Sequence, residues 1–166
     1  MSHRTHPYRQ IITQPREWIA RWVQVKQNLE DPWTHGYTTL GYFDYKKQGL
    51  IAAVVFDRFT KREDDCFQDC CLHVAGEGMW ATKEFLFAVF DYVFNQLNCV
   101  RVTGLVAASN ESARRFDEHL GFTNEATISK ELPCSDLIVY RMFKQDCRWI
   151  KPEVKHGRRQ KLPRRA

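Results

Sequence analysis

The sequence has no long hydrophobic run. No segment of its 166 residues approaches the roughly 18 to 20 consecutive apolar residues that a membrane-spanning helix needs. The opening MSHRTHPYRQ has charged residues but no apolar run behind them, as a secretory leader would have. We therefore expect a soluble cytoplasmic protein that does not associate with a membrane.

Regularly spaced cysteines are also lacking. The six cysteines do not show the spacing of a small disulfide-bonded domain, and a chain of this length folds without cross-links. Cys66, Cys70, Cys71 and His73 lie close in sequence, but they contain no paired Cys-x-x-Cys. Strand alternation would also place Cys70 and Cys71 on opposite faces. We expect reduced thiols, no metal site and no nucleophilic cysteine.

The remaining composition indicates one domain with a basic tail. At 43% hydrophobic, the chain is long enough for a single full core and shows no internal repeat. We place the domain at residues 1–150 and the tail at 151–166, where seven Lys or Arg face a single acid, Glu153. The tail is either an arm for nucleic acid or an acidic protein, or a solvated terminus. No aromatic residue follows Trp149, so base stacking there has little support.

Periodicity along the chain predicts an α/β domain. We expect a helix capped by Thr13, with Pro15 in its first turn, with Trp18, Trp22 and Val25 on one face, and ending at Asp31-Pro32. A second, largely apolar helix is expected over 82–97. The predicted strands are Tyr37–Tyr45, Leu50–Phe59, Phe67–Ala75, Val100–Val106, Ala126–Leu132 and Leu137–Phe143. This order predicts a single domain built on a central mixed, mostly antiparallel sheet flanked by helices.

The stretch ASNESARRFDEHLGF, residues 108–122, predicts a well-capped third helix. Ala113, Phe116 and Leu120 recur at helical spacing on one face, whereas Glu111, Arg114, Arg115 and Glu118 would face water. Ser109 or Asn110 is the candidate N-cap. Gly121 would end the helix in the left-handed conformation, and Phe122 would return to the core. Each of these features has a purely structural explanation.

The order of elements around this helix resembles the GNAT superfamily of acyl-CoA-dependent N-acetyltransferases. The resemblance covers roughly Leu50 to Phe143, and its most specific part is the Asn-x-x-Ala-x-x-Phe run that ends in Leu-Gly-Phe. It implies a GNAT-like fold, acetyl-CoA as co-substrate, and acetyl transfer to a primary amine: a protein N-terminus, a lysine or a small amine. The short, divergent chain also looks like GNAT-like proteins of tailed bacteriophages, which would place it in a host cytoplasm or a virion.

The resemblance also assigns cofactor contacts by position. The end of the strand after His73 would pair with the pantetheine arm, and the GEGMWAT turn would offer backbone N–H groups to the pyrophosphate. Met79 stands where the family pattern has a glycine, and Gly78 is one residue away from that place. Asn110 would bind the arm, and Arg114 or Arg115 would reach its phosphates. The implied cofactor-binding residues are Val74, Ala75, Gly76, Gly78, Met79, Trp80, Ala81, Thr82, Asn110, Arg114 and Arg115.

For the chemistry, the resemblance points to three residues. Asp117 stands seven residues after Asn110, where many family members have the tyrosine that reprotonates the leaving thiolate. An exposed aspartate, with a pKa of about 3.9, is a poor proton donor at neutral pH. His73 and Asp57 are the candidates for deprotonating the amine, and an imidazole titrates near pH 6.5. A purely structural role for His73 remains open.

Two functions therefore follow from the sequence. The first is an acetyl-CoA-dependent N-acetyltransferase, in which backbone N–H groups stabilise the developing oxyanion. The second is a catalytically silent GNAT-fold protein, such as a phage virion or host-takeover component, that uses its basic tail to bind an acidic partner. A homodimer is compatible with either function.

Overall fold

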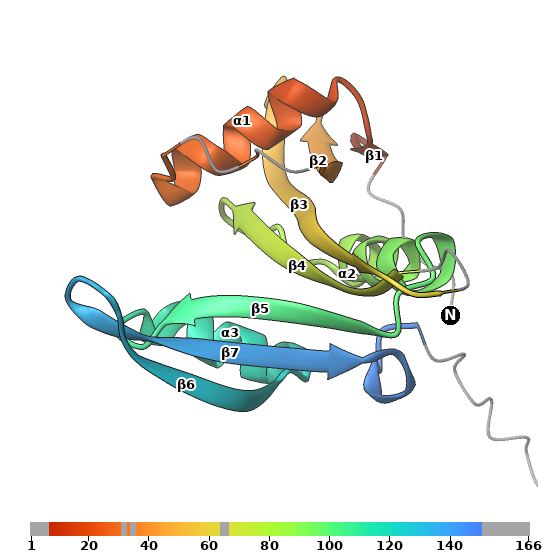
Figure 1. The fold of residues 1–166 in the computed structure, drawn as a ribbon. Helices are drawn as coiled ribbons and strands as arrows, with labels where there is room; N and C mark the ends of the chain where they lie inside the picture. The colour runs from red at the N-terminus through yellow and green to blue at the C-terminus, as the bar shows by residue number, and fades with distance from the viewer. Residues whose placement is uncertain (1–6, 31–32, 34–35, 64–66, 151–166) are drawn as a thin grey trace, which may run out of the picture.

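The computed structural model describes residues 7–30, 33, 36–63 and 67–150, and these form one seven-stranded sheet with helices on both faces. The strand order is β1-β2-β3-β4-β5-β7-β6, and β4 and β5 are the parallel neighbours in an otherwise antiparallel sheet (Figure 1). The strands are β1 Arg9–Ile12, β2 Thr38–Asp44, β3 Gly49–Lys61, β4 Phe67–Gly76, β5 Arg101–Ala107, β6 Thr123–Leu132 and β7 Ser135–Phe143. The helices are α1 Arg16–Gln27, α2 Lys83–Asp91 and α3 Glu111–Leu120, with a π-helical turn η1 Tyr92–Gln96 and a 3-10 turn η2 Lys144–Asp146.

This architecture confirms the predicted α/β domain with a mixed, mostly antiparallel sheet. The six predicted strands are all present, and the consecutive strands β2 and β3 pair antiparallel as a hairpin. Strand β1, which pairs with β2, was missed because its four residues are too few to set up a visible alternation. The basic tail at 151–166 and Cys66 lie outside the described residues. Within the described part of the chain, no helix is long and apolar enough to span a membrane.

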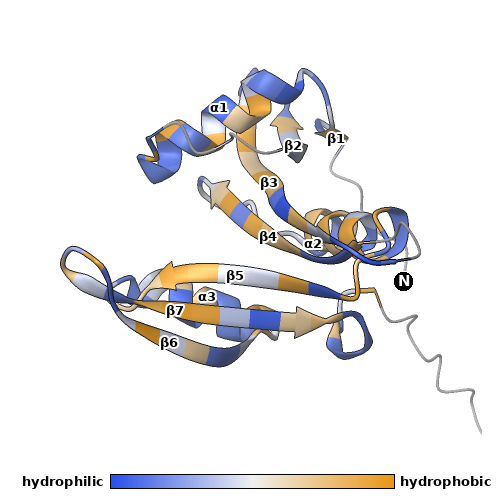
Figure 2. Cartoon of the chain, viewed as in Figure 1, coloured by the Kyte–Doolittle hydropathy of each residue, from blue (hydrophilic) through white to orange (hydrophobic). Residues whose placement is uncertain are grey.

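Helix α1 covers one face of the sheet, and α2 and α3 cover the other (Figure 1). Buried apolar residues of α1 pack on β3 and the end of β4, in a small cluster that contains Ile19, Val23, Ala53 and Val55. Figure 2 shows hydrophobic residues along β3 and a mostly hydrophilic outer surface on α1. The larger cluster lies under α2 and α3, where Phe85, Phe90 and Phe94 are almost fully buried. Burial of this apolar area is the main stabilising contribution to the domain.

Helix α1 departs from the prediction in three respects. Pro15, with an extended backbone, is the N-cap, and Gln14 Oε1 accepts a hydrogen bond from Arg16 N–H at 3.2 Å, so Thr13 does not have the predicted role. The helix ends at Gln27, because Asn28 adopts the left-handed conformation before Asp31 is reached. Its buried residues are Ile19, Ala20 and Val23 rather than the tryptophan face, and Trp18 is 43% exposed. The small Ala20 lets the helix approach the sheet closely on that side.

The sheet parts between β4 and β5. These two strands share a single paired position, Cys71 with Thr103, and a backbone bond from Val100 N–H to the Gln68 carbonyl supports it at 3.2 Å. Beyond this point the strands diverge toward their carboxyl ends (Figure 1). Residues 72–76 of β4 and 104–107 of β5 therefore have backbone groups that do not pair with each other, although β3 and β7 pair with their other edges.

We predict that Gly121→Ala lowers the free energy of unfolding by about 1–2 kcal/mol, because residues with a side chain are strained at the Gly121 φ of 108°. Urea titration followed by circular dichroism measures the change. Gly49→Ala is the matched control, since a Cβ there meets only a carbonyl oxygen at 3.8 Å. Equal losses in the two variants would contradict the assigned role of Gly121.

Candidate active site

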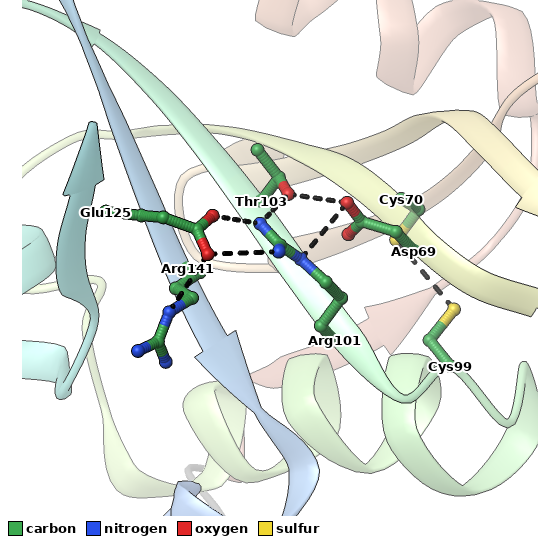
Figure 3. Close-up of polar contacts among 7 residues, drawn as sticks. All are labelled: Asp69, Cys70, Cys99, Arg101, Thr103, Glu125 and Arg141. Atoms are coloured by element: carbon green, nitrogen blue, oxygen red, sulfur yellow. Dashed lines mark hydrogen bonds and ion pairs between the residues drawn. The ribbon is translucent and has the colours of Figure 1, made fainter. Parts of the chain in front are cut away.

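A polar cluster holds the sheet together at the point where β4 and β5 part. Thr103 Oγ1 donates a hydrogen bond to Asp69 Oδ2 at 2.7 Å, and Arg101 Nε lies 3.2 Å from the same oxygen (Figure 3). Arg101 also donates to Glu125 at 2.8 Å, and Arg141 Nε lies 3.2 Å from that carboxylate. Four strands, β4, β5, β6 and β7, are thereby connected by side chains. The cluster fixes the vertex of the opening, while the strand ends beyond it remain apart.

Directly behind the vertex, two buried thiols face each other. Cys70 Sγ lies 4.0 Å from Cys99 Sγ, and both residues are about 1% exposed (Figure 3). The hydrogen bond with Cys99, together with burial, raises the pKa of the Cys70 thiol. Burial likewise raises the pKa of Cys71 to about 11. Cys70 and Cys71 are therefore protonated at neutral pH and lack the thiolate that a nucleophile needs.

His73 and Asp57 form a hydrogen-bonded pair on the α1 face. His73 Nε2 lies 2.9 Å from Asp57 Oδ1, and the two side chains are 19% and 6% exposed. The two residues come from β4 and β3, whose register sets His73 opposite Val55 and Asp57 opposite Cys71. If Nε2 carries the proton and donates it to the carboxylate, the lone pair on Nδ1 is free to accept a proton. The structure brings the two candidate bases together as one unit.

An aromatic residue, Trp33, packs against this pair. The Trp33 ring lies 5.1 Å from the His73 ring in an edge contact, and its buried Nε1 has no hydrogen-bond partner among the described residues. Because Trp33 lies outside every helix and strand that the structure describes, no sequence periodicity indicated its position. Among the described residues, no three His, Cys, Asp or Glu side chains are grouped closely enough to hold a metal ion.

The end of β4 is the predicted place of the pantetheine arm, and a side chain of α1 lies over it. Gln27 Nε2 donates to the Val74 carbonyl at 2.8 Å in an exposed hydrogen bond. Ala75 is buried against α1. Lys26 pairs with Glu77, which turns that carboxylate toward α1. A ligand that pairs with the free edge at Val74 must therefore displace Gln27, a contact that no sequence pattern could reveal.

The GEGMWAT turn connects β4 to α2. Thr82, as the N-cap, accepts a bond from Phe85 N–H at 3.2 Å, and the turn puts the start of α2 beside the end of β4. Met79 is 88% exposed, and its carbonyl accepts a hydrogen bond from Arg9 Nη1 at 3.3 Å. Gly78, one residue before it, has a φ of 63°. Ala81 lies between Trp80 and the helix cap and is exposed.

Trp80 packs inward from the same turn. A Cβ on Gly76 would lie 2.4 Å from carbons of the Trp80 indole, so glycine is required where the ring meets the strand. The Trp80 ring also lies 5.2 Å from the Phe116 ring of α3. The indole thus connects the turn to the helix on the other side of the opening.

On α3, the predicted phosphate and arm ligands have structural partners. Asn110 Oδ1 accepts from Ala113 N–H at 3.1 Å, which identifies Asn110 rather than Ser109 as the side-chain cap. Arg114 donates to the Ala108 carbonyl at 3.2 Å and is partly buried, contrary to its predicted solvent exposure. Arg115 is exposed and pairs with Glu111 at 3.1 Å. Of the two arginines, Arg115 therefore has the more accessible guanidinium for binding a phosphate.

Asp117 differs most from its predicted state. The sequence analysis treated it as exposed, but it is only 9% exposed, and its Oδ2 lies 3.4 Å from where a Cβ on Gly104 would be. Burial, with a smaller effect from the Glu118 charge, raises its pKa to about 7. The prediction was wrong because Asp117 falls on the α3 face that packs on β5. Asp117 thus lies beside Gly104, the first residue of β5 after the last β4–β5 pair. A carboxyl group with this pKa can donate a proton at neutral pH.

We predict that the stability of the native protein falls between pH 5 and pH 8 and that Asp117→Asn removes much of this fall. A carboxyl whose pKa is raised on folding stabilises the fold only while it is protonated, so the contribution is present below about pH 4 and lost as pH rises through 7. At pH 8, the loss of this contribution should lower the free energy of unfolding by on the order of a few kcal/mol. Urea titrations at both pH values test this. Asp146→Asn, at an exposed position, is the control, and an unchanged pH slope in Asp117→Asn would refute the prediction.

Comparison with known proteins supports this geometry at the level of fold. No model of a protein family matches the sequence, and no curated protein sequence matches it. Among solved structures, spermidine N-acetyltransferase from Vibrio cholerae, in complex with CoA and spermine, matches with a TM-score of 0.65 and 14% identity, over 87% of this chain and 99% of that chain. A dodecameric structure of spermidine N-acetyltransferase from the same organism matches with a TM-score of 0.66, at 14% identity, over 83% and 95% of the two chains.

A third similar structure is the ribosomal-protein-S5-alanine acetyltransferase from Vibrio fischeri. It matches with a TM-score of 0.58 and 18% identity, over 82% of this chain and 72% of that one. At these identities the likeness is one of backbone architecture. The chain has the fold of GNAT N-acetyltransferases, as the order of its elements predicted.

Proposed function

We propose that this protein is an N-acetyltransferase that moves the acetyl group of acetyl-CoA to a primary amine. The observation that carries the proposal is the parting of β4 and β5 beyond Cys71 and Thr103, with the Asp57–His73 pair at its edge. A solved protein of the same fold is described in complex with CoA and spermine, which supports CoA as the ligand of this opening. No observation specifically favours the silent binding protein or a phage origin.

In this proposal the chain binds the cofactor mainly through its backbone. The free edge of β4 at Val74, Ala75 and Gly76 pairs with the pantetheine arm once Gln27 is displaced. The turn from Gly78 to Thr82 offers the N–H groups at the start of α2 to the pyrophosphate, where the helix dipole favours negative charge. Asn110 and Arg114 contact the arm from the start of α3, and Arg115 extends from the exposed side toward a phosphate.

The chemistry is direct transfer. The amine nitrogen attacks the thioester carbonyl in its neutral form, and His73, oriented by Asp57, accepts the proton that this nitrogen loses on forming the new C–N bond. Backbone N–H groups at the strand ends stabilise the oxyanion that forms. The intermediate collapses to the amide and releases the CoA thiolate, which takes a proton from Asp117. Water regenerates both groups for the next cycle.

Binding of acetyl-CoA is the first test. Isothermal titration should give one site per chain with a micromolar dissociation constant, which is the range usual for enzyme substrates. A thermal shift assay with the same cofactor is the independent readout. No heat and no shift at millimolar acetyl-CoA would overturn the proposal.

Catalysis is the second test. His73→Ala should lower kcat by about 10²- to 10⁴-fold, measured as thiol release with a panel of amines, while acetyl-CoA affinity stays unchanged. His119→Ala, at an exposed position on α3, is the matched control and should keep the parental kcat. A parental kcat in His73→Ala would mean that another group accepts the proton.

A further inference from the structure

An open groove with a basic rim lies near the Asp57–His73 pair, although neither residue of the pair lines it. It has a volume of about 720 Å³ and lies between the start of α1, the end of β3 and the η1 turn. Three cations, Arg16, Arg58 and Lys61, line it, and none of its described lining residues is acidic. The groove is large enough for several side chains of a bound ligand.

The positive charge of the groove is poorly compensated. Arg16 pairs with exposed Glu17 at 3.3 Å, and Arg58 Nε lies 4.0 Å from Asp57 Oδ2. Both contacts are weak, since exposed ion pairs contribute little and 4.0 Å is at the limit of contact. Among the described residues no acid pairs with Lys61. The rim therefore presents a net positive charge to a ligand.

Two contacts connect this groove to the proposed base. Arg58 lines the groove, and its Nε lies 4.0 Å from Asp57 Oδ2. Tyr37 also lines it, and its ring lies 6.2 Å from that of Trp33, which packs against His73. A ligand that presents an amine to His73 can therefore extend past Trp33 and Tyr37 along the rim.

The floor of the groove is apolar, and its rings already have partners. The rings of Phe59 and Phe67 lie 4.7 Å apart, and Tyr92 lies 5.5 Å from Phe56. The Arg16 guanidinium covers the Tyr37 ring at 4.9 Å. Few open ring faces are left for stacking the bases of a nucleic acid. An apolar floor under a cationic rim fits a peptide that carries both acidic and apolar side chains.

We infer that the amine acceptor is the N-terminus of a polypeptide whose next residues are acidic and apolar. This inference rests on the proposed acetyltransferase function, which supplies the amine at His73. A polyamine would bring several positive charges to the three cations of the groove and would be repelled. The acceptor class is therefore opposite in charge to the spermine seen in one of the similar solved structures.

Direct binding tests the inference without any catalytic step. Short peptides that begin with alanine, followed by glutamate, phenylalanine and aspartate, carry a fluorophore at the C-terminus, and anisotropy reports their affinity for the full chain. A matched peptide has lysine in place of both acids. The acidic peptide should bind at least tenfold more tightly, and its affinity should fall as salt is raised.

Charge reversal locates the binding. Lys61→Glu should weaken the acidic peptide about threefold to tenfold, with Lys61→Gln in between. Lys130→Glu is the control, since it reverses the same charge on an exposed residue of another strand, β6. Equal binding of the two peptides, or equal losses in Lys61→Glu and Lys130→Glu, would overturn the inference, as would tighter binding of single-stranded oligonucleotides at the same salt concentration.

Acetylation separates this inference from the proposed function. With acetyl-CoA, thiol release should be faster with the acidic peptide than with spermidine. Release that is faster with spermidine would refute the peptide acceptor and leave the acetyltransferase intact. If acetyl-CoA fails to bind while the acidic peptide still binds through Lys61, the proposed function falls and the groove remains a peptide site.

Discussion

Loss of hydrogen bonding between β4 and β5 is the constraint on which the rest of this structure depends. A sheet that continued to pair after Cys71 and Thr103 would leave no free backbone edge for a ligand. Exposed edges are unfavourable in proteins unless something occupies or protects them. Here Gln27 covers part of the β4 edge at Val74, and Trp80 packs at its end against Gly76. The fold maintains an opening at the cost of unpaired backbone groups.

At the vertex of that opening, two partners compensate the partly buried charge of Asp69. Burial raises the pKa of Asp69, so the carboxylate needs the Thr103 hydroxyl and the Arg101 guanidinium to remain charged there. Removing either partner would leave a partly buried charge uncompensated. Since Arg101 also contacts Glu125, the cluster ties the first half of the sheet to the last strands. The contact of Asp69 with Thr103 and Arg101 therefore sets the position at which the two halves of the sheet separate.

Both faces of the opening contribute groups with different chemistry. The α1 face holds the Asp57–His73 pair, which can accept a proton, and the α3 face holds buried Asp117, which can donate one near neutral pH. The environments differ because one carboxylate is hydrogen-bonded to an imidazole and the other is desolvated against β5. The basic groove lies between the start of α1, the end of β3 and the η1 turn, so in the proposed reaction the acceptor approaches the Asp57–His73 pair from that end of β3.

The sequence by itself determined the order of the helices and of six of the seven strands, and the Gly121 stop, because these depend on local periodicity and backbone conformation. It left the cap of α3 open between Ser109 and Asn110. It also named His73, Asp57 and Asp117, but not their states. Only the tertiary structure decided that His73 and Asp57 are hydrogen-bonded and that Asp117 is buried. It also decided that Trp33 packs on His73, that Gln27 covers the β4 edge, and that three cations line a separate groove. Those properties arise from contacts between residues far apart in the chain, and burial sets a pKa only once the fold has formed.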